Sequence, residues 1–133
     1  MKILVVDDDP GMARAVQRLL RGDEVEVAHA PDAALDLVES ADKSGRPFEL
    51  VLCDYLLPGM TGIELGTALS ERREPPMFGL MSGYDSPAAL TPNLVALVKP
   101  FTPTELRQAV RALVTAKAAA ITQRIPRLSL AVG

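Results

Sequence analysis

The sequence predicts an α/β protein with a doubly wound, five-stranded parallel sheet of order 2-1-3-4-5 and helices on both faces. Short apolar runs alternate with segments of helical periodicity along most of the chain, which is typical of βαβ units with right-handed crossovers. The first run is continuously apolar, as in strands buried on both faces. A chain of 133 residues with 48% apolar side chains is long enough to form one such core.

Each expected strand ends at a polar or turn-forming residue. The first strand runs from Ile3 to Val6 and is followed by three consecutive aspartates, and the third ends at Asp54. The second alternates valine with acidic residues, which is typical of a strand near the sheet edge. The five strands are expected at residues 3–6, 25–27, 48–54, 77–81 and 94–98.

The expected helices follow the strands. Asp9-Pro10 reads as an N-cap followed by proline at the first helical position, and Gly22 ends that helix. A second helix begins at Pro31, and a third spans residues 62–73. A long final helix is expected from Thr104 to about Ala120, because Ile125-Pro126 interrupts the helical pattern.

We therefore predict one domain, residues 1–120, followed by a C-terminal tail, residues 121–133. Polar and apolar residues alternate from Arg127 to Val132 as they would in a strand. The tail is expected to dock on the sheet edge near Val27, in the same chain or in a second copy as a possible homodimer. The alternative is a solvated end.

Charge and composition exclude several classes of protein. Residues 1–106 carry nine basic and 17 acidic side chains, and the five basic residues after them are unopposed. The 4% aromatic content argues against stacking platforms for single-stranded nucleic acid. No segment resembles a signal peptide or membrane span, and a single cysteine suits a reducing compartment, so a cytoplasmic protein without membrane contact is expected. No helix-turn-helix fits the 13 residues after Ala120, so we also expect no direct DNA binding.

Chemistry is expected at the carboxyl ends of the strands, where ligands bind to open parallel sheets. The residues at these ends are Asp7, Asp8, Asp54, Ser82 and Lys99. Strands one and three are neighbours in the predicted order, so their carboxylates converge and repel unless a cation joins them. An oxygen-only ligand set favours Mg²⁺, and a hydroxyl with an ammonium group suits phosphoryl oxygens. The pattern indicates a site that places phosphate on a carboxylate.

Four motifs in order carry a resemblance to a known family. They are Ile3-Leu4-Val5-Val6-Asp7-Asp8, Asp54 with Pro58-Gly59-Met60-Thr61-Gly62, Met81-Ser82-Gly83-Tyr84, and Val98-Lys99-Pro100-Phe101. Over roughly residues 1–118 the chain resembles the receiver domain of two-component response regulators, which has a flavodoxin-like fold.

The resemblance implies a phosphoacceptor and its partners. Asp54 would accept a phosphoryl group from a histidine kinase or histidine phosphotransfer protein and switch binding to a downstream protein target. Asp8 and Asp54 would ligate Mg²⁺ directly, Asp7 through water, and the backbone carbonyl of Leu56 would complete the protein ligands. Ser82 and Lys99 would bind phosphoryl oxygens, and the Lys99–Pro100 bond would be cis. The protein would not be an enzyme beyond its own phosphorylation and slow dephosphorylation.

The sequence departs from this family in two places. Ala96 stands where receivers usually carry a switching aromatic residue, and the interval from Ser82 to Lys99 is about five residues shorter than usual. We therefore expect the conformational change in the loop from Gly83 to Pro92.

Two other functions stay open. One is an aspartyl-phosphate hydrolase with Asp7 as nucleophile, and the other is a scaffold that binds a partner without phosphorylation. Three further polar residues receive ordinary structural assignments: Asp9 as a helix cap, Cys53 as buried packing and His29 as a surface side chain.

Overall fold

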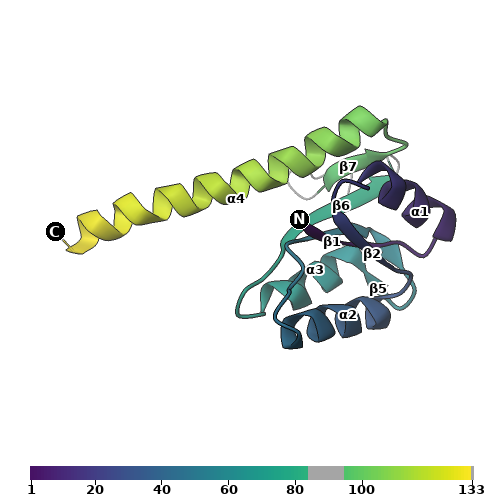
Figure 1. Ribbon diagram of the computed structural model, residues 1–133, viewed down its shortest axis with the longest axis horizontal. Coiled ribbons are helices and arrows are strands. Elements are labelled where there is room, and N and C mark those ends of the chain that lie inside the picture. Colours follow the sequence, from purple (N-terminus) through teal and green to yellow (C-terminus); the bar gives the residue numbers. More distant parts are fainter. Residues whose placement is uncertain (84–94, 133) are drawn as a thin grey trace.

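A computed structural model describes the backbone of residues 1–83 and 95–132 and shows a twisted sheet with a long C-terminal helix (Figure 1). Five strands form one parallel sheet in the order β2-β1-β3-β6-β7, which confirms the predicted topology. They are β1 (Lys2–Val6), β2 (Glu24–Ala28), β3 (Leu50–Asp54), β6 (Met77–Gly83) and β7 (Val95–Lys99). Two short strands, β4 (Leu56–Leu57) and β5 (Met60–Thr61), form a separate antiparallel pair.

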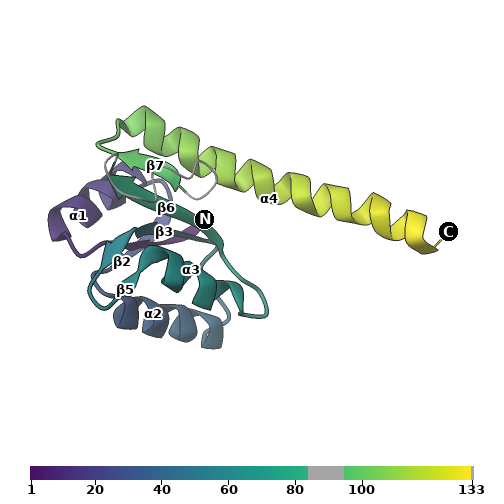
Figure 2. The ribbon, with the colours of Figure 1, turned by 180° about the vertical axis from the view of Figure 1, so that it is seen from behind.

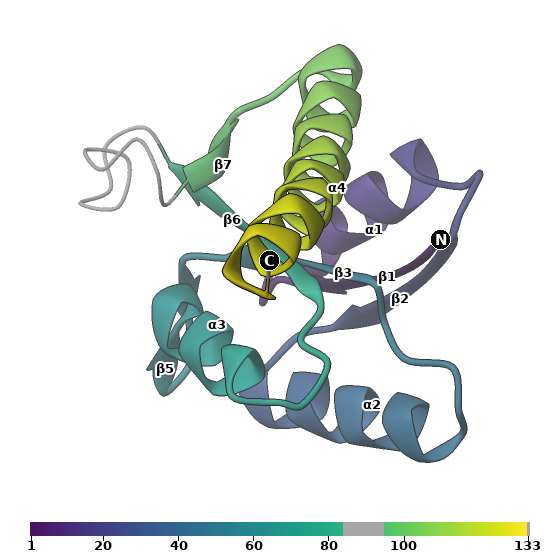
Figure 3. The same ribbon diagram turned by 90° about the vertical axis from the view of Figure 1, so that its left-hand side faces the viewer.

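The helices cover both faces of the sheet, as predicted. α1 (Pro10–Leu19) and α4 (Pro103–Val132) lie on one face, and α2 (Pro31–Lys43) and α3 (Gly62–Ser70) lie on the other (Figures 2 and 3). The alternation of side chains along the buried central strands divides the core between these two layers.

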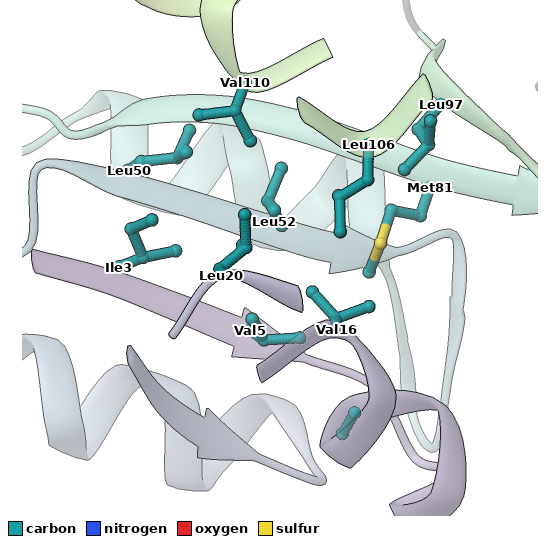
Figure 4. Packing of buried hydrophobic residues seen from close by; sticks show 11 residues of the cluster. Ile3, Val5, Val16, Leu20, Leu50, Leu52, Met81, Leu97, Leu106 and Val110 are labelled. Atoms are coloured by element: carbon teal, nitrogen blue, oxygen red, sulfur yellow. The ribbon is translucent and has the colours of Figure 1, made fainter. Parts of the chain in front are cut away.

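One of the two core clusters lies between the sheet and the α1–α4 layer (Figure 4). Leu106 and Val110 of α4 meet Val16 and Leu20 from the α1 segment across the side chains of three central strands. These strand residues are Ile3, Val5, Leu50, Leu52 and Met81, and Leu97 of β7 also belongs to the cluster. The opposite layer buries alanine, valine and leucine side chains of α2 and α3 against Leu4, Val6, Val51 and Cys53.

The strand register aligns the carboxyl ends of β1 and β3. Val6 lies beside Ala28 of β2 on one side and beside Cys53 of β3 on the other. Asp7 and Asp54, each the next residue along its chain, therefore reach the same sheet edge. β6 continues this alignment, because Asp54 lies beside Met81, which precedes Ser82.

The predicted end of the last helix near Ala120 is wrong. α4 runs for 30 residues to Val132, through Pro126, and projects away from the sheet (Figure 1). A proline inside a helix removes one hydrogen bond and strains the preceding turn, and for this reason the sequence pattern indicated a helix end there. Residues 127–132 are helical, so the expectation that they add to the sheet as a strand is also wrong, and the predicted boundary at residue 120 lies within α4.

α4 packs on the core through its first half. Leu106 and Val110 are buried, whereas Val114, one turn further along, is 39% exposed. An ideal Cβ built on Gly79 of β6 would lie 2.7 Å from Leu113 Cδ1 and 3.3 Å from Ala96 Cβ. The absence of a side chain at Gly79 thus leaves room for Leu113 on the sheet. The predicted Gly83–Pro92 switching loop lies, beyond Gly83, outside the described residues.

Candidate functional site

Three consecutive aspartates follow β1, and each has a different environment. Asp7 is fully buried, and its Oδ1 accepts a hydrogen bond from the Asp9 amide at 2.9 Å. Asp9 caps α1, since its Oδ1 accepts from the amides of Gly11 and Met12, which confirms its predicted role. Asp8 is exposed, and among the described residues its carboxylate takes part in no hydrogen bond or ion pair.

Lys99 joins the ends of three strands. Its Nζ lies 2.8 Å from Asp7 Oδ2 and 3.2 Å from Asp54 Oδ1. Lys99 ends β7, and the Lys99–Pro100 peptide bond is cis, as expected. The structure thus brings together Asp7, Asp54 and Lys99, which are far apart in the sequence.

Burial and neighbouring charges both shift the pKa values of Asp54 and Lys99. Burial raises the pKa of Asp54 above its usual range, Lys99 opposes that shift and Asp7 adds to it. Burial lowers the pKa of Lys99, but the hydrogen bond and charge of Asp7, with the charge of Asp54, outweigh it and leave that pKa raised. Lys99 therefore stays an ammonium group, whereas the ionised form of Asp54 is disfavoured by its surroundings.

The three acids also fit a divalent cation. One carboxylate oxygen each from Asp7, Asp8 and Asp54 lies within 4.8 Å of the other two. Hard oxygen donors, one exposed and two less accessible, suit Mg²⁺, which binds few protein carboxylates and keeps several waters. The three aspartates among the predicted metal residues are thus adjacent in space, and the chemistry of their oxygen donors suits the ion.

Leu56 and Ser82 flank Asp54. Leu56 begins β4, pairs with Thr61 of β5, and leaves its side chain 65% exposed. Gly59, with a φ of 77°, makes the tight turn between these two strands. Ser82 is fully buried in β6, and its hydroxyl donates to the Gly83 carbonyl at 3.3 Å.

Cys53 is buried packing, as predicted. Its Sγ donates to the Asp54 carbonyl at 3.2 Å, and burial raises the pKa of the thiol to about 12. A thiol held in this way is not a reactive group at neutral pH.

Sequence reasoning missed two residues that support the site. His29 is exposed, as expected of a surface side chain, but its Nδ1 lies 3.0 Å from the Asp7 carbonyl oxygen. Gly62 begins α3 directly against the Asp54 backbone, where an ideal Cβ on Gly62 would lie 2.4 Å from the Asp54 carbonyl oxygen. The available signals were the position of His29 at the end of the strand beside β1 and the place of Gly62 in the motif after Asp54.

Comparisons with known proteins point to the same fold and to one family of proteins. The family model for the response regulator receiver domain matches residues 3–111. The DNA-binding response regulator MtrA of Mycolicibacterium smegmatis is 36% identical over 124 residues, which cover 84% of this chain and 49% of that protein. A receiver-domain structure from Clostridium thermocellum has a TM-score of 0.72 at 21% identity, covering 90% of this chain and 98% of that one.

A third match is the receiver domain of the putative response regulator NarL from Mycobacterium tuberculosis. Its TM-score is 0.67 at 29% identity, and the match covers 84% of this chain and 93% of that one.

These matches correct the expectation of no direct DNA binding. The MtrA relatives are named as DNA-binding regulators, and the chain spans about half of their length. The expectation depended on the few residues after Ala120, which carry no information about a DNA-binding element elsewhere in a protein of that length. Among the described residues, no helix combines the length and apolar character needed to cross a membrane.

Proposed function

Because the chain belongs to the response regulator receiver domain family of two-component signalling, we propose that Asp54 accepts a phosphoryl group from a phosphohistidine. The phosphodonor would be a histidine kinase or a histidine phosphotransfer protein in the cytoplasm. The observation that carries the proposal is the placement of Asp54 beside a partly buried lysine and two further aspartates at one sheet edge.

The transfer itself is a displacement at phosphorus. A carboxylate oxygen of Asp54 attacks, an O–P bond forms, the P–N bond to the histidine breaks, and the leaving imidazole nitrogen takes up a proton. Lys99, held beside Asp54 Oδ1, neutralises charge on the phosphoryl oxygens, and Ser82 supplies a hydroxyl at the next strand end. Such a reaction needs positioning and electrostatic stabilisation more than covalent help from the protein.

We propose that Mg²⁺ is the cofactor, held by Asp8, Asp54 and, through water, Asp7, with the Leu56 carbonyl as a further ligand. When bound, the ion neutralises charge on the acids and the phosphoryl group. The hydrogen bonds of Asp7 support this division of roles, because its Oδ1 accepts from Asp9 and its Oδ2 from Lys99. The Asp8 carboxylate accepts neither of these hydrogen bonds, so both of its oxygens can face the Mg²⁺ ion directly.

Mass spectrometry tests the proposal. The wild-type chain, incubated with Mg²⁺ and a small acyl phosphate, should gain one phosphoryl group on Asp54, and Asp54→Asn should gain none. Asp9→Asn is the matched control, since asparagine also caps helices and Asp9 is outside the acidic cluster. Labelling of Asp7 would indicate the hydrolase, and absence of labelling with a competent donor would indicate the scaffold.

The output is proposed from the relatives. MtrA is named as a DNA-binding response regulator, and MprA of Mycobacterium avium, 35% identical over 120 residues, as a response regulator. These names support control of DNA binding as the output of a protein that carries this receiver.

A further inference from the structure

On the side that faces β2, the backbone of Asp7 forms two hydrogen bonds, one with a backbone group and one with a side chain. In a parallel ladder, the N–H and C=O of one residue bond to the two residues that flank its partner. The Asp7 amide follows this rule and donates to the Ala28 carbonyl at 3.0 Å. If the ladder continued, the Asp7 carbonyl would accept from the amide of residue 30.

That second bond is made by a side chain instead. Ala30 is the N-cap of α2, where the chain leaves the strand, and the backbone bonds of the described residues include none from Ala30 to Asp7. His29 Nδ1 lies 3.0 Å from the Asp7 carbonyl oxygen. Because a carbonyl only accepts, Nδ1 carries the hydrogen and donates it, in the neutral ring as well as in the imidazolium.

This bond acts on the link between two acids of the site. The Asp7 carbonyl and the Asp8 amide belong to one planar peptide group, so holding the carbonyl fixes the direction in which the chain enters Asp8. The Asp7 side chain has other anchors in Asp9 and Lys99. The exposed Asp8 carboxylate has no such anchor among the described contacts and depends on its backbone for its position.

We propose that His29 is a positioning residue for the divalent-cation site, acting through the Asp7–Asp8 peptide. The proposal rests on the Mg²⁺ site of the proposed function. His29 is exposed, so water reaches the Asp7 carbonyl when the imidazole is removed, and the fold loses little. A water does not hold the peptide plane as a ring fixed to β2 does, and groups that orient metal ligands typically change affinity by 10- to 100-fold.

Calorimetric titration of the full chain with Mg²⁺ tests the role. His29→Ala should weaken Mg²⁺ binding roughly tenfold, the lower end of the range for such groups. His29→Asn should recover most of the affinity, because its amide N–H lies at a similar reach from the backbone. Gln17→Ala is the matched control: Gln17 Nε2 donates to the Val25 carbonyl at 3.1 Å, a bond of the same kind to β2 that lies away from the acids.

Nuclear magnetic resonance without metal gives an independent measurement. A hydrogen bond to the Asp7 carbonyl polarises the peptide, so the Asp8 amide nitrogen should shift in His29→Ala, return in His29→Asn and stay unchanged in Gln17→Ala. Melting temperatures of the two alanine variants should agree closely.

The outcomes separate the two proposals. A wild-type chain that binds no Mg²⁺ overturns the metal site of the proposed function. A wild-type chain that binds Mg²⁺, with His29→Ala within twofold of Gln17→Ala in affinity, overturns the positioning role alone.

Discussion

Replacing Gly62 by alanine should damage both the fold and the phosphorylation site. The new Cβ would lie 2.4 Å from the Asp54 carbonyl oxygen and 2.6 Å from Leu80 Cδ1, whereas real Cβ contacts essentially never fall below 3.0 Å. The Asp54 contact must therefore open by about 0.6 Å. The leucine can turn away, but the carbonyl is backbone and carries the acceptor residue with it.

The expected loss is about 2–3 kcal/mol of unfolding free energy, the upper part of the range for overpacking, or roughly 8–12 °C in melting temperature for a domain of this size. The rate of phosphorylation should fall by roughly tenfold, since a displacement of about 1 Å costs on the order of 100-fold.

Thermal unfolding and the rate of labelling by an acyl phosphate measure the two effects of Gly62→Ala. Gly22→Ala is the control, because no atom lies within 4 Å of its ideal Cβ, and it should leave both quantities near wild type. A Gly62→Ala variant that melts and reacts as the control does would refute the close packing of α3 against Asp54.

Three further predictions concern the acceptor, its neighbour and α4. Because burial raises the pKa of Asp54, the native state holds this proton more tightly than the unfolded state, and stability decreases as pH rises from the unfolded pKa through the folded one. Asp54→Asn should therefore melt higher than wild type at pH 7 without Mg²⁺, with the difference lost near pH 3; equal melting at both pH values would contradict this. Leu56→Asn should speed the decay of phosphorylated Asp54 severalfold, because the apolar, exposed Leu56 offers no hydrogen bond to attacking water; an unchanged decay rate would remove Leu56 from the argument. Removing residues 121–133 should lower the helical circular dichroism signal but shift the melting temperature by no more than about 2 °C. The reason is that the described contacts of α4 with the core lie between Leu106 and Leu113. A larger shift would show that the projecting half of α4 contributes to the fold.

The course of α4 could not be predicted from the sequence, because its signals are local and contradictory. Pro126 argues for a helix end, and the seven residues after it are too few to distinguish a period of two from a period of 3.6. The helix-favouring alanines at 118–120 stand before the proline, and the sequence offers no neighbouring element against which either pattern could be tested. Strands packed on both faces leave no such ambiguity, and for this reason the order and the carboxyl ends of β1 and β3 were predicted correctly, although β3 begins at Leu50 and not at residue 48.

The acids of the site were predictable because each follows a strand that the sequence marks clearly, and parallel topology alone brings such ends together. The residues that support these acids depend on the register between neighbouring strands, which cannot be read from the sequence. His29 reaches the Asp7 carbonyl only because Val6 pairs with Ala28, so that the residues after them lie side by side. A shift of one residue in β2 would place Ala28 or Ala30 beside Asp7, and neither has a side-chain donor. On the other side of β1, the pairing of Val6 with Cys53 brings Asp54, the next residue, beside Asp7, so the registers of β2 and β3 with β1 together decide which residues surround the Asp7 position.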